Sequence, residues 1–375
     1  MFIDWLSCYQ DFEIDLPIVS KTGSIRVDFE TGETSFPKQH SFSHPGSFST
    51  SILIEVKHRR IYMKGNPSRY NRLDNVFGFT TFDQCVAVYN QILKSLGLPS
   101  FTKNTQIRLA EVTTKSGKPK IVRFGNGMVI TEVHVTENIN VGQGCTDAYL
   151  KALAMLPYRH SQPRLHANGK TVDWLSKLGN ARELYPKVYE KANELKLHAL
   201  PTVKRRFGVD SPEYKYISDL ITYCEENGVV RFEQKFRSPF IKKYDLHLYG
   251  LNDLANYSEI HNQFLSIDDK LQVSAMDLQT ISQTLLEKKI CDTTRAANTT
   301  AFYAYNWMNG QTFDFSKSQV KTHRARLRSI GIDIAKPCNL LIFSPVIVKE
   351  VTEISKSKTV PPSFYKHPNH LSLVA

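Results

Sequence analysis

The sequence predicts an α+β fold, with an antiparallel sheet first and a mainly helical part after it. Apolar and polar residues alternate, as in half-buried strands, over residues 51–63, 128–139 and 229–236. After about residue 250 helical patterns take over, and the composition shifts near residues 251–259. The chain of 375 residues exceeds one typical domain, so we expect two, at 1–250 and 251–375.

Helical patterns separate the strands. Residues 81–96 carry an apolar stripe at helical spacing, formed by Cys85, Val88, Ile92 and Leu96. Another helix is expected to start at Ser211, since serine is a good N-cap and Pro212 suits the first helical position. The segment from residue 355 onward is rich in Pro, Ser, Lys and His, and we expect it to be loose.

The charge balance favours a polyanionic partner. Lys and Arg number 48 against 36 Asp and Glu, which gives a net charge of +12 and a pI near 9.3. The six cysteines form no CxxC pair, so a cysteine zinc site is not expected. The N-terminus lacks the pattern of a signal peptide, and no apolar run is long enough to span a bilayer. We expect a soluble, cytoplasmic protein without membrane contact.

Tyr189 stands between Lys187 and Lys191, in a segment that reads as a short strand running into a helix. At strand spacing the three side chains share one face. Neighbouring ammonium groups favour the phenolate, which attacks electrophiles such as phosphodiesters, and they face the charge that grows on the phosphate oxygens. The alternative is a half-buried tyrosine on a solvated basic edge.

Two strands offer metal ligands. Glu132 and His134 share a face of the strand at 128–139, and Glu233 lies on the strand at 229–236. If both strands belong to one sheet, these groups converge on a site that suits Mg²⁺ or Mn²⁺. The alternatives are solvent-facing side chains, or, for Glu233 between Arg231 and Lys235, a cross-strand salt bridge.

Residues 316–334 predict a basic helix that ends at Gly331. Its polar face is formed by Lys317, Lys321, Arg324 and Arg328, and its apolar stripe by Val320, His323, Leu327 and Ile330. A turn with serine as N-cap precedes it, which is the profile of a helix-turn-helix unit laid in a DNA groove. The alternative is a solvated surface helix. The basic loop at 64–72 is either a clasp for a sugar-phosphate backbone or an ordinary solvated loop.

Five segments, at 75–78, 131–136, 189–195, 228–233 and 326–334, together resemble the replication initiators of filamentous bacteriophages, the gene II protein family. The resemblance implies a rolling-circle initiator with a nuclease-like catalytic domain. Such an enzyme nicks one strand of the replicative-form origin, stays on the 5′ end through a phosphotyrosine, and later rejoins the displaced strand.

The same resemblance implies roles for single residues. Tyr189 falls on the tyrosine of the family's YxKxxEL motif and Lys191 on its lysine, and Glu233, in the RFE strand, is the best candidate metal ligand. Where the family has an arginine and an aspartate, this chain has Glu132 and His134, so one of these two completes the shell of Mg²⁺ or Mn²⁺. Tyr185 is a candidate second tyrosine.

The expected partners are origin DNA, first double-stranded and then nicked, and a host helicase and polymerase. Since no GxxxxGK[ST] loop is present, unwinding falls to the helicase. The sequence does not decide between a monomer and a homodimer. The main alternative function is a non-enzymatic DNA-binding repressor or copy-number regulator. A tyrosine recombinase is disfavoured, because the tyrosine lies mid-chain beside lysines.

Overall fold

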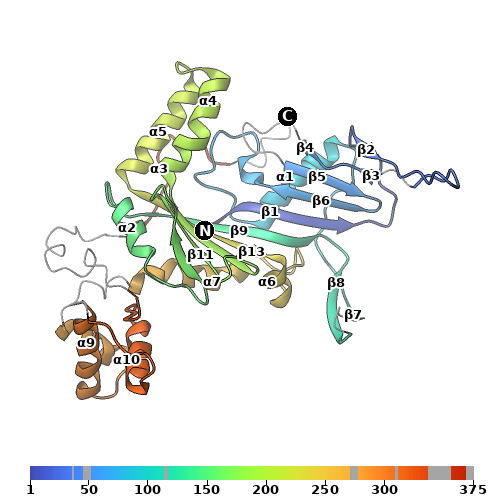
Figure 1. Cartoon of the computed structure of the whole chain (residues 1–375). Helices are drawn as coiled ribbons and strands as arrows, with labels where there is room; N and C mark the ends of the chain where they lie inside the picture. The colour runs from blue at the N-terminus through green and yellow to red at the C-terminus, as the bar shows by residue number, and fades with distance from the viewer. Residues whose placement is uncertain are drawn as a thin grey trace.

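The computed structural model describes residues 1–35, 38–44, 52–113, 117–270, 278–308, 311–336 and 356–368 (Figure 1). In these ranges one ten-stranded sheet dominates. Its strand order is β10-β11-β12-β13-β9-β1-β6-β5-β4, all neighbours are antiparallel, and β14 pairs with β9. The strands are β1 (Phe2–Asp11), β4 (Phe42–His44), β5 (Ile52–Lys57), β6 (Arg60–Gly65), β9 (Val129–Asn140), β10 (Gln162–Leu165), β11 (Thr171–Leu175), β12 (Leu184–Glu190), β13 (Val229–Arg237) and β14 (Ser357–Lys358).

Two short ribbons stand apart from this sheet. They are β2 (Gly23–Ser24) with β3 (Lys38–Gln39), and β7 (Ile107–Thr113) with β8 (Pro119–Gly125). The α-helices are α1 (Phe82–Ser95), α2 (Thr146–Leu153), α3 (Lys191–Glu194), α4 (Leu200–Phe207), α5 (Pro212–Glu226), α6 (Ser238–Lys243), α7 (Ala255–Leu265), α8 (Leu278–Glu287), α9 (Thr294–Met308) and α10 (Ser318–Ser329). Short 3₁₀ turns lie at Pro67–Arg69 and Ser266–Lys270, and a π-helical turn at Leu195–Ala199.

The alternation of apolar and polar residues that predicted the strands matches which side chains enter the apolar cores. Val133 on β9 and Phe232 and Phe236 on β13 are fully buried in apolar cores, while the residues between them form a polar face. The expected helices are also present. Thr81 caps α1 in a capping box with Gln84, and Ser211 caps α5. The predicted α+β class with an antiparallel sheet is therefore confirmed.

The apolar core of the sheet continues beyond residue 250. Tyr257 and Phe264 of α7 and the nearby Ile267 are buried in it. Helices α8, α9 and α10 build a separate core, with Leu285, Ala301 and Leu327 fully buried. Within the described ranges, no helix combines the length and the apolar character that a bilayer crossing requires.

The expectation that the chain is loose from residue 355 onward is wrong for residues 356–368. Strand β14 pairs with Ile139 and Asn140 of β9. Tyr365 is 6% exposed, and its hydroxyl donates to Asp74 Oδ1 at 3.0 Å and accepts from Arg72 at 2.7 Å. Composition suggested a tail, but one aromatic side chain with a buried polar partner fixes it.

Tyr365→Phe should lower the free energy of unfolding by about 1–3 kcal/mol, because it leaves the buried Asp74 and Arg72 short of a partner. Urea unfolding followed by circular dichroism measures this. Tyr244→Phe is the matched control, since Tyr244 is 47% exposed and should change stability by less than about 0.5 kcal/mol. Equal stabilities of the two variants would contradict the assigned role of Tyr365.

Candidate active site

The candidate site is a polar face shared by β12, β13 and β9. The antiparallel register places Glu233 between Lys187 and Thr136, and Arg231 between Tyr189 and Asn138. His134 lies opposite Lys235. Because side chains alternate in direction along each strand, all of these groups point to the same side of the sheet. The condition set for convergence, that the two ligand strands belong to one sheet, is met.

Glu233 is the centre of this face and is 3% exposed. Its Oε2 accepts from the Tyr189 hydroxyl at 3.2 Å and lies 3.0 Å from Lys187 Nζ. Its Oε1 lies 3.3 Å from His134 Nδ1. Burial by itself raises the pKa of this carboxyl, but Lys187 and the hydrogen bond with His134 together bring the pKa well below its usual range. Glu233 is therefore a carboxylate.

Tyr189 differs from the expectation in its acidity. It is 8% exposed, and burial followed by the nearby Glu233 carboxylate raises its pKa well above the usual value. The prediction that the flanking lysines favour the phenolate is therefore wrong for the protein in this structure. Lys187 does lie over the ring, with Nζ 4.8 Å from the centroid, but its charge is directed to Glu233. A phenol in this environment needs a proton acceptor, and Glu233 is already hydrogen-bonded to it.

Lys191 does not continue the strand face of Tyr189, since it is the first residue of α3. Its fully buried ammonium donates to Asn75 Oδ1 at 2.7 Å and to Glu194 Oε2 at 2.5 Å. Burial, and next the charge of Arg231, lower its pKa. Lys191 thus connects the start of the helix to the loop before α1.

Arg231 is a residue whose importance the sequence did not reveal. It is fully buried, and its Nε donates to Asn138 at 2.9 Å while another nitrogen donates to the carbonyl oxygens of Asn75 and Val76, each at 2.6 Å. It forms an ion pair with Asp4, at 3.6 Å, and not with Glu233. The only sequence signal was a charge on an otherwise buried strand, which is unusual without partners.

The predicted metal ligands are brought together only in part. Glu132 and Glu233 contact opposite nitrogens of His134, at 2.9 Å from Nε2 and 3.3 Å from Nδ1. In the part of the chain that the structure describes, no three His, Cys, Asp or Glu side chains are grouped to hold a metal ion. Glu233 with His134 offers one carboxylate and one imidazole, a donor pair that suits Mn²⁺ better than Mg²⁺, because Mg²⁺ prefers oxygen ligands.

Tyr185 belongs to a neighbouring polar cluster. Its hydroxyl donates to Asp173 Oδ2 at 2.7 Å, and burial together with this carboxylate raises its pKa to about 12. Arg164 binds the same carboxylate with two nitrogens, at 3.0 and 2.7 Å, and His166 lies 3.1 Å from it. Asp173 is fully buried, so this cluster forms a second anchored group beside the Glu233 site.

The basic helix at 318–329 is α10. Its expected apolar stripe is buried, but its N-cap is Lys317, without a side-chain cap, where a serine was expected. Lys317, Lys321 and Arg328 are exposed. Arg324 donates two hydrogen bonds to Asp333, at 2.7 and 3.1 Å, so its guanidinium is held by the turn after α10, although the side chain is 34% exposed.

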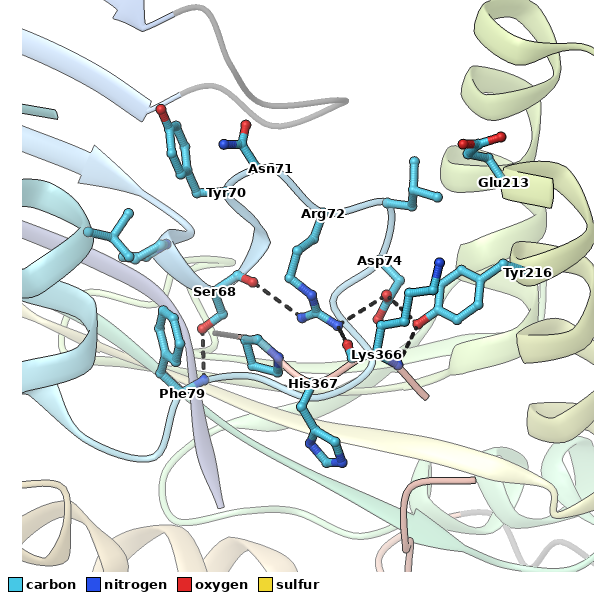
Figure 2. A pocket seen from close by; sticks show the side chains of 14 residues that line it. Ser68, Tyr70, Asn71, Arg72, Asp74, Phe79, Glu213, Tyr216, Lys366 and His367 are labelled. Carbon is cyan, nitrogen blue, oxygen red and sulfur yellow. Dashed lines mark hydrogen bonds and ion pairs between the residues drawn. The ribbon is translucent and has the colours of Figure 1, made fainter. Parts of the chain in front are cut away.

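A cavity of about 320 Å³ lies away from Tyr189, among the basic loop, α5 and the C-terminal segment. Figure 2 shows Arg72 turned inward, bound to Ser68, Asp74 and Lys366. The guanidinium of Arg72 is therefore engaged within the protein, and within this loop it is not an arm that extends toward DNA.

Glu194→Gln should lower the free energy of unfolding at pH 7 by about 3 kcal/mol, because Lys191 loses its buried carboxylate partner. Burial by itself raises the pKa of Glu194, but the charge and hydrogen bond of Lys191 together with the charge of Arg231 lower it to about 2. A depressed folded-state pKa stabilises the protein above the unfolded-state value near 4.3, and that contribution is lost as pH falls toward 2.

The difference in the free energy of unfolding between wild type and Glu194→Gln should thus narrow as pH falls from about 4.5 to 2. Denaturant unfolding at pH 7, 4 and 3 measures it. Glu226→Gln, at an exposed position of α5, is the control and should give a small gap at every pH. A gap for Glu194→Gln that does not depend on pH would refute the ion pair.

Comparison with known proteins now adds to this geometry. The N-terminal family of the phage replication-associated protein (the gene II protein) matches residues 2–252, and the C-terminal family of the same protein matches residues 285–371. The replication-associated protein of Escherichia phage If1 is 50% identical over 320 residues, which are 85% of this chain and 98% of that protein. No solved structure matches the chain. The resemblance to filamentous-phage replication proteins is thereby confirmed, and the chain belongs to the gene II family of replication-associated proteins.

Proposed function

We propose that this protein is a rolling-circle replication initiator of a phage, a metal-dependent DNA endonuclease that nicks the replicative-form origin and later rejoins the displaced strand. The observation that carries the proposal is the hydrogen bond of Tyr189 to the buried Glu233 within a cluster of lysines, on the strands where the family motifs lie. The 50% identical phage relative, whose name is replication-associated, supports a role in replication. The setting would be the cytoplasm of the bacterial host, with its helicase and polymerase.

Tyr189 is the proposed nucleophile. Its oxygen attacks the phosphorus, the bond from phosphorus to the 3′ oxygen breaks, and that oxygen takes a proton from water, so the strand leaves with a free 3′ hydroxyl while the 5′ phosphate stays on the tyrosine. Glu233 Oε2, which already accepts the phenolic hydrogen bond at 3.2 Å, takes the proton. One phosphodiester replaces another, so the bond energy is retained for rejoining.

Lys187 and Lys235 provide positive charge for the phosphate. Lys187 Nζ is 3.0 Å and Lys235 Nζ is 3.9 Å from the Glu233 carboxylate, and both side chains are about one-quarter exposed. An incoming phosphate would therefore meet these ammonium groups first. Lys191 acts as a positioning residue, because its contacts go to Asn75 and Glu194.

Glu233 and His134 are the proposed holders of Mg²⁺ or Mn²⁺, with Glu132 fixing the far nitrogen of the imidazole. A bound divalent ion would polarise the scissile phosphate and neutralise charge in the transition state. Of the two alternatives for the first ligand strand, His134 is favoured over Glu132, because it is the one adjacent to Glu233.

Tyr189→Phe should reduce nicking of supercoiled DNA that carries the cognate origin by at least about 10³-fold while leaving DNA binding intact. Gel analysis of relaxed product and of SDS-stable protein–DNA adduct measures this, with Mg²⁺ or Mn²⁺ present and with EDTA as the metal-free arm. EDTA and Glu233→Gln should also abolish nicking. Tyr185→Phe should retain it, because that hydroxyl is committed to Asp173.

Tyr244→Phe serves as the exposed control in the same assay. Binding of origin DNA without cleavage by the wild-type protein would overturn the proposal and favour a non-enzymatic regulator. Cleavage that survives Tyr189→Phe with an adduct on another residue would reassign the nucleophile.

Replacing Lys317, Lys321 and Arg328 together by Ala should weaken duplex binding and flatten the slope of log affinity against log salt by about 2–3, since each phosphate contact contributes roughly 0.9. Arg324→Ala should instead lower stability, because it releases Asp333. Lys94, Lys151 and Lys215, all exposed on other helices, form the charge-matched control triple. Equal salt slopes for the two triples would show that α10 does not contact DNA phosphates.

A further inference from the structure

The β7–β8 ribbon is a two-stranded hairpin that projects from the large sheet (Figure 1). No third strand pairs with it among the described residues. Five large apolar side chains on it are between 40% and 69% exposed, namely Ile107, Leu109, Val112, Ile121 and Phe124. A bare hairpin of this kind is marginal in water, which indicates that its surface meets a partner.

The charge of the ribbon identifies the kind of partner. Its described residues include four basic side chains, Arg108, Lys118, Lys120 and Arg123, against one acidic side chain, Glu111, and of the four Arg123 is paired with Asp245 at 3.2 Å. The cross-strand register places Arg108 opposite Phe124, Val112 opposite Lys120, and Leu109 opposite Arg123. Both faces therefore interleave cations with apolar groups. A nucleic-acid groove offers phosphates along its walls and bases on its floor, and the major groove admits a two-stranded ribbon.

The base of the ribbon, where it joins the large sheet, is tightly packed, although the ribbon itself is exposed. Asn104 is 3% exposed, and it donates to the carbonyl oxygens of Met128 and Tyr249 at 2.8 and 3.0 Å. A Cβ on Gly125 would lie 1.8 Å from Asn104 Oδ1, and one on Gly127 would lie 2.6 Å from the Thr102 carbonyl oxygen, so backbone and side chain interlock there. This packing at the base fixes the direction in which the ribbon leaves the sheet.

The ribbon also leads directly into the candidate site. Strand β8 ends at Gly125 and β9, which carries His134, begins at Val129. His134 is therefore about 17 Å from the start of β9, at roughly 3.3 Å per residue, and the seven-residue ribbon is about 23 Å long. Figure 1 shows the ribbon turned away from the direction of β9, so duplex held on the ribbon would lie to one side of the candidate site.

We propose that the β7–β8 ribbon binds a groove of duplex DNA beside the cleavage point and so places the origin on the active site. The inference rests on the proposed nicking function. Two ribbons of the same sign repel one another, which favours DNA over a second copy of this chain as the occupant.

The test uses the full chain with Arg108→Ala and Lys120→Ala combined, and Lys94→Ala with Lys215→Ala as the charge-matched control. Two substrates are compared: duplex DNA with the cognate origin, and a single-stranded oligonucleotide with only the nick site. The ribbon variant should bind the duplex at least about 10-fold more weakly and lose part of the nuclease footprint beside the cut, yet cleave the oligonucleotide at the wild-type rate. Melting temperatures of both variants check the fold.

Duplex affinity and footprint equal to those of the control variant would overturn the inference while wild-type nicking stands. A change in oligomeric state, measured by sedimentation, that accounts for the affinity loss would assign the ribbon to a second copy and also overturn it. Failure of the wild type to nick would refute the proposed function itself, which is a separate outcome.

Discussion

The buried guanidinium of Arg231 is the constraint on which the rest of the site depends. An ionised group with 0% exposure needs acceptors for its donors and a balancing charge, and in Arg231 Nε and Nη2 are hydrogen-bonded while Nη1 has only the ion pair with Asp4. The partners of Arg231 come from β9 through Asn138, from the loop before α1 through the carbonyl oxygens of Asn75 and Val76, and from β1 through Asp4. One cation thus fixes three elements, and the loop that it fixes in turn holds Lys191.

The same cluster explains why Tyr189 is protonated although lysines surround it. Each ammonium has a nearer carboxylate, Glu233 for Lys187 and Glu194 for Lys191, so little positive charge remains for the phenol. Burial of the Tyr189 side chain is then the largest effect, and it raises the pKa of the phenol. A phenol in such a site is protonated and therefore a weak nucleophile. A phosphate that draws Lys187 away from Glu233 would both uncover the tyrosine and leave a more basic carboxylate to receive its proton.

The periodicity of apolar residues predicted which faces of strands and helices are buried. It did not predict the polar contacts between residues that are far apart in the sequence. The faces of β9 and β13 followed from alternation, because apolar residues must turn to the core, and the stripe of α10 followed in the same way. The ion pair of Arg324 with Asp333 could not be predicted, since it depends on how the chain returns after α10. Nor could Tyr365, whose partner Asp74 lies 291 residues away in a segment with no pattern of its own. The sign of the Tyr189 pKa shift failed because sequence proximity does not reveal which carboxylate an ammonium chooses.

The return of the C-terminal segment to the sheet has a consequence for how the protein is made. Asp74 is synthesised 291 residues before Tyr365, which is roughly 15–60 s earlier at about 5–20 residues per second. Until then Asp74 and Arg72 lack a partner that the finished protein provides. A nascent chain that has not yet reached Tyr365 would thus carry Tyr189 but lack this contact on the loop that holds Lys191.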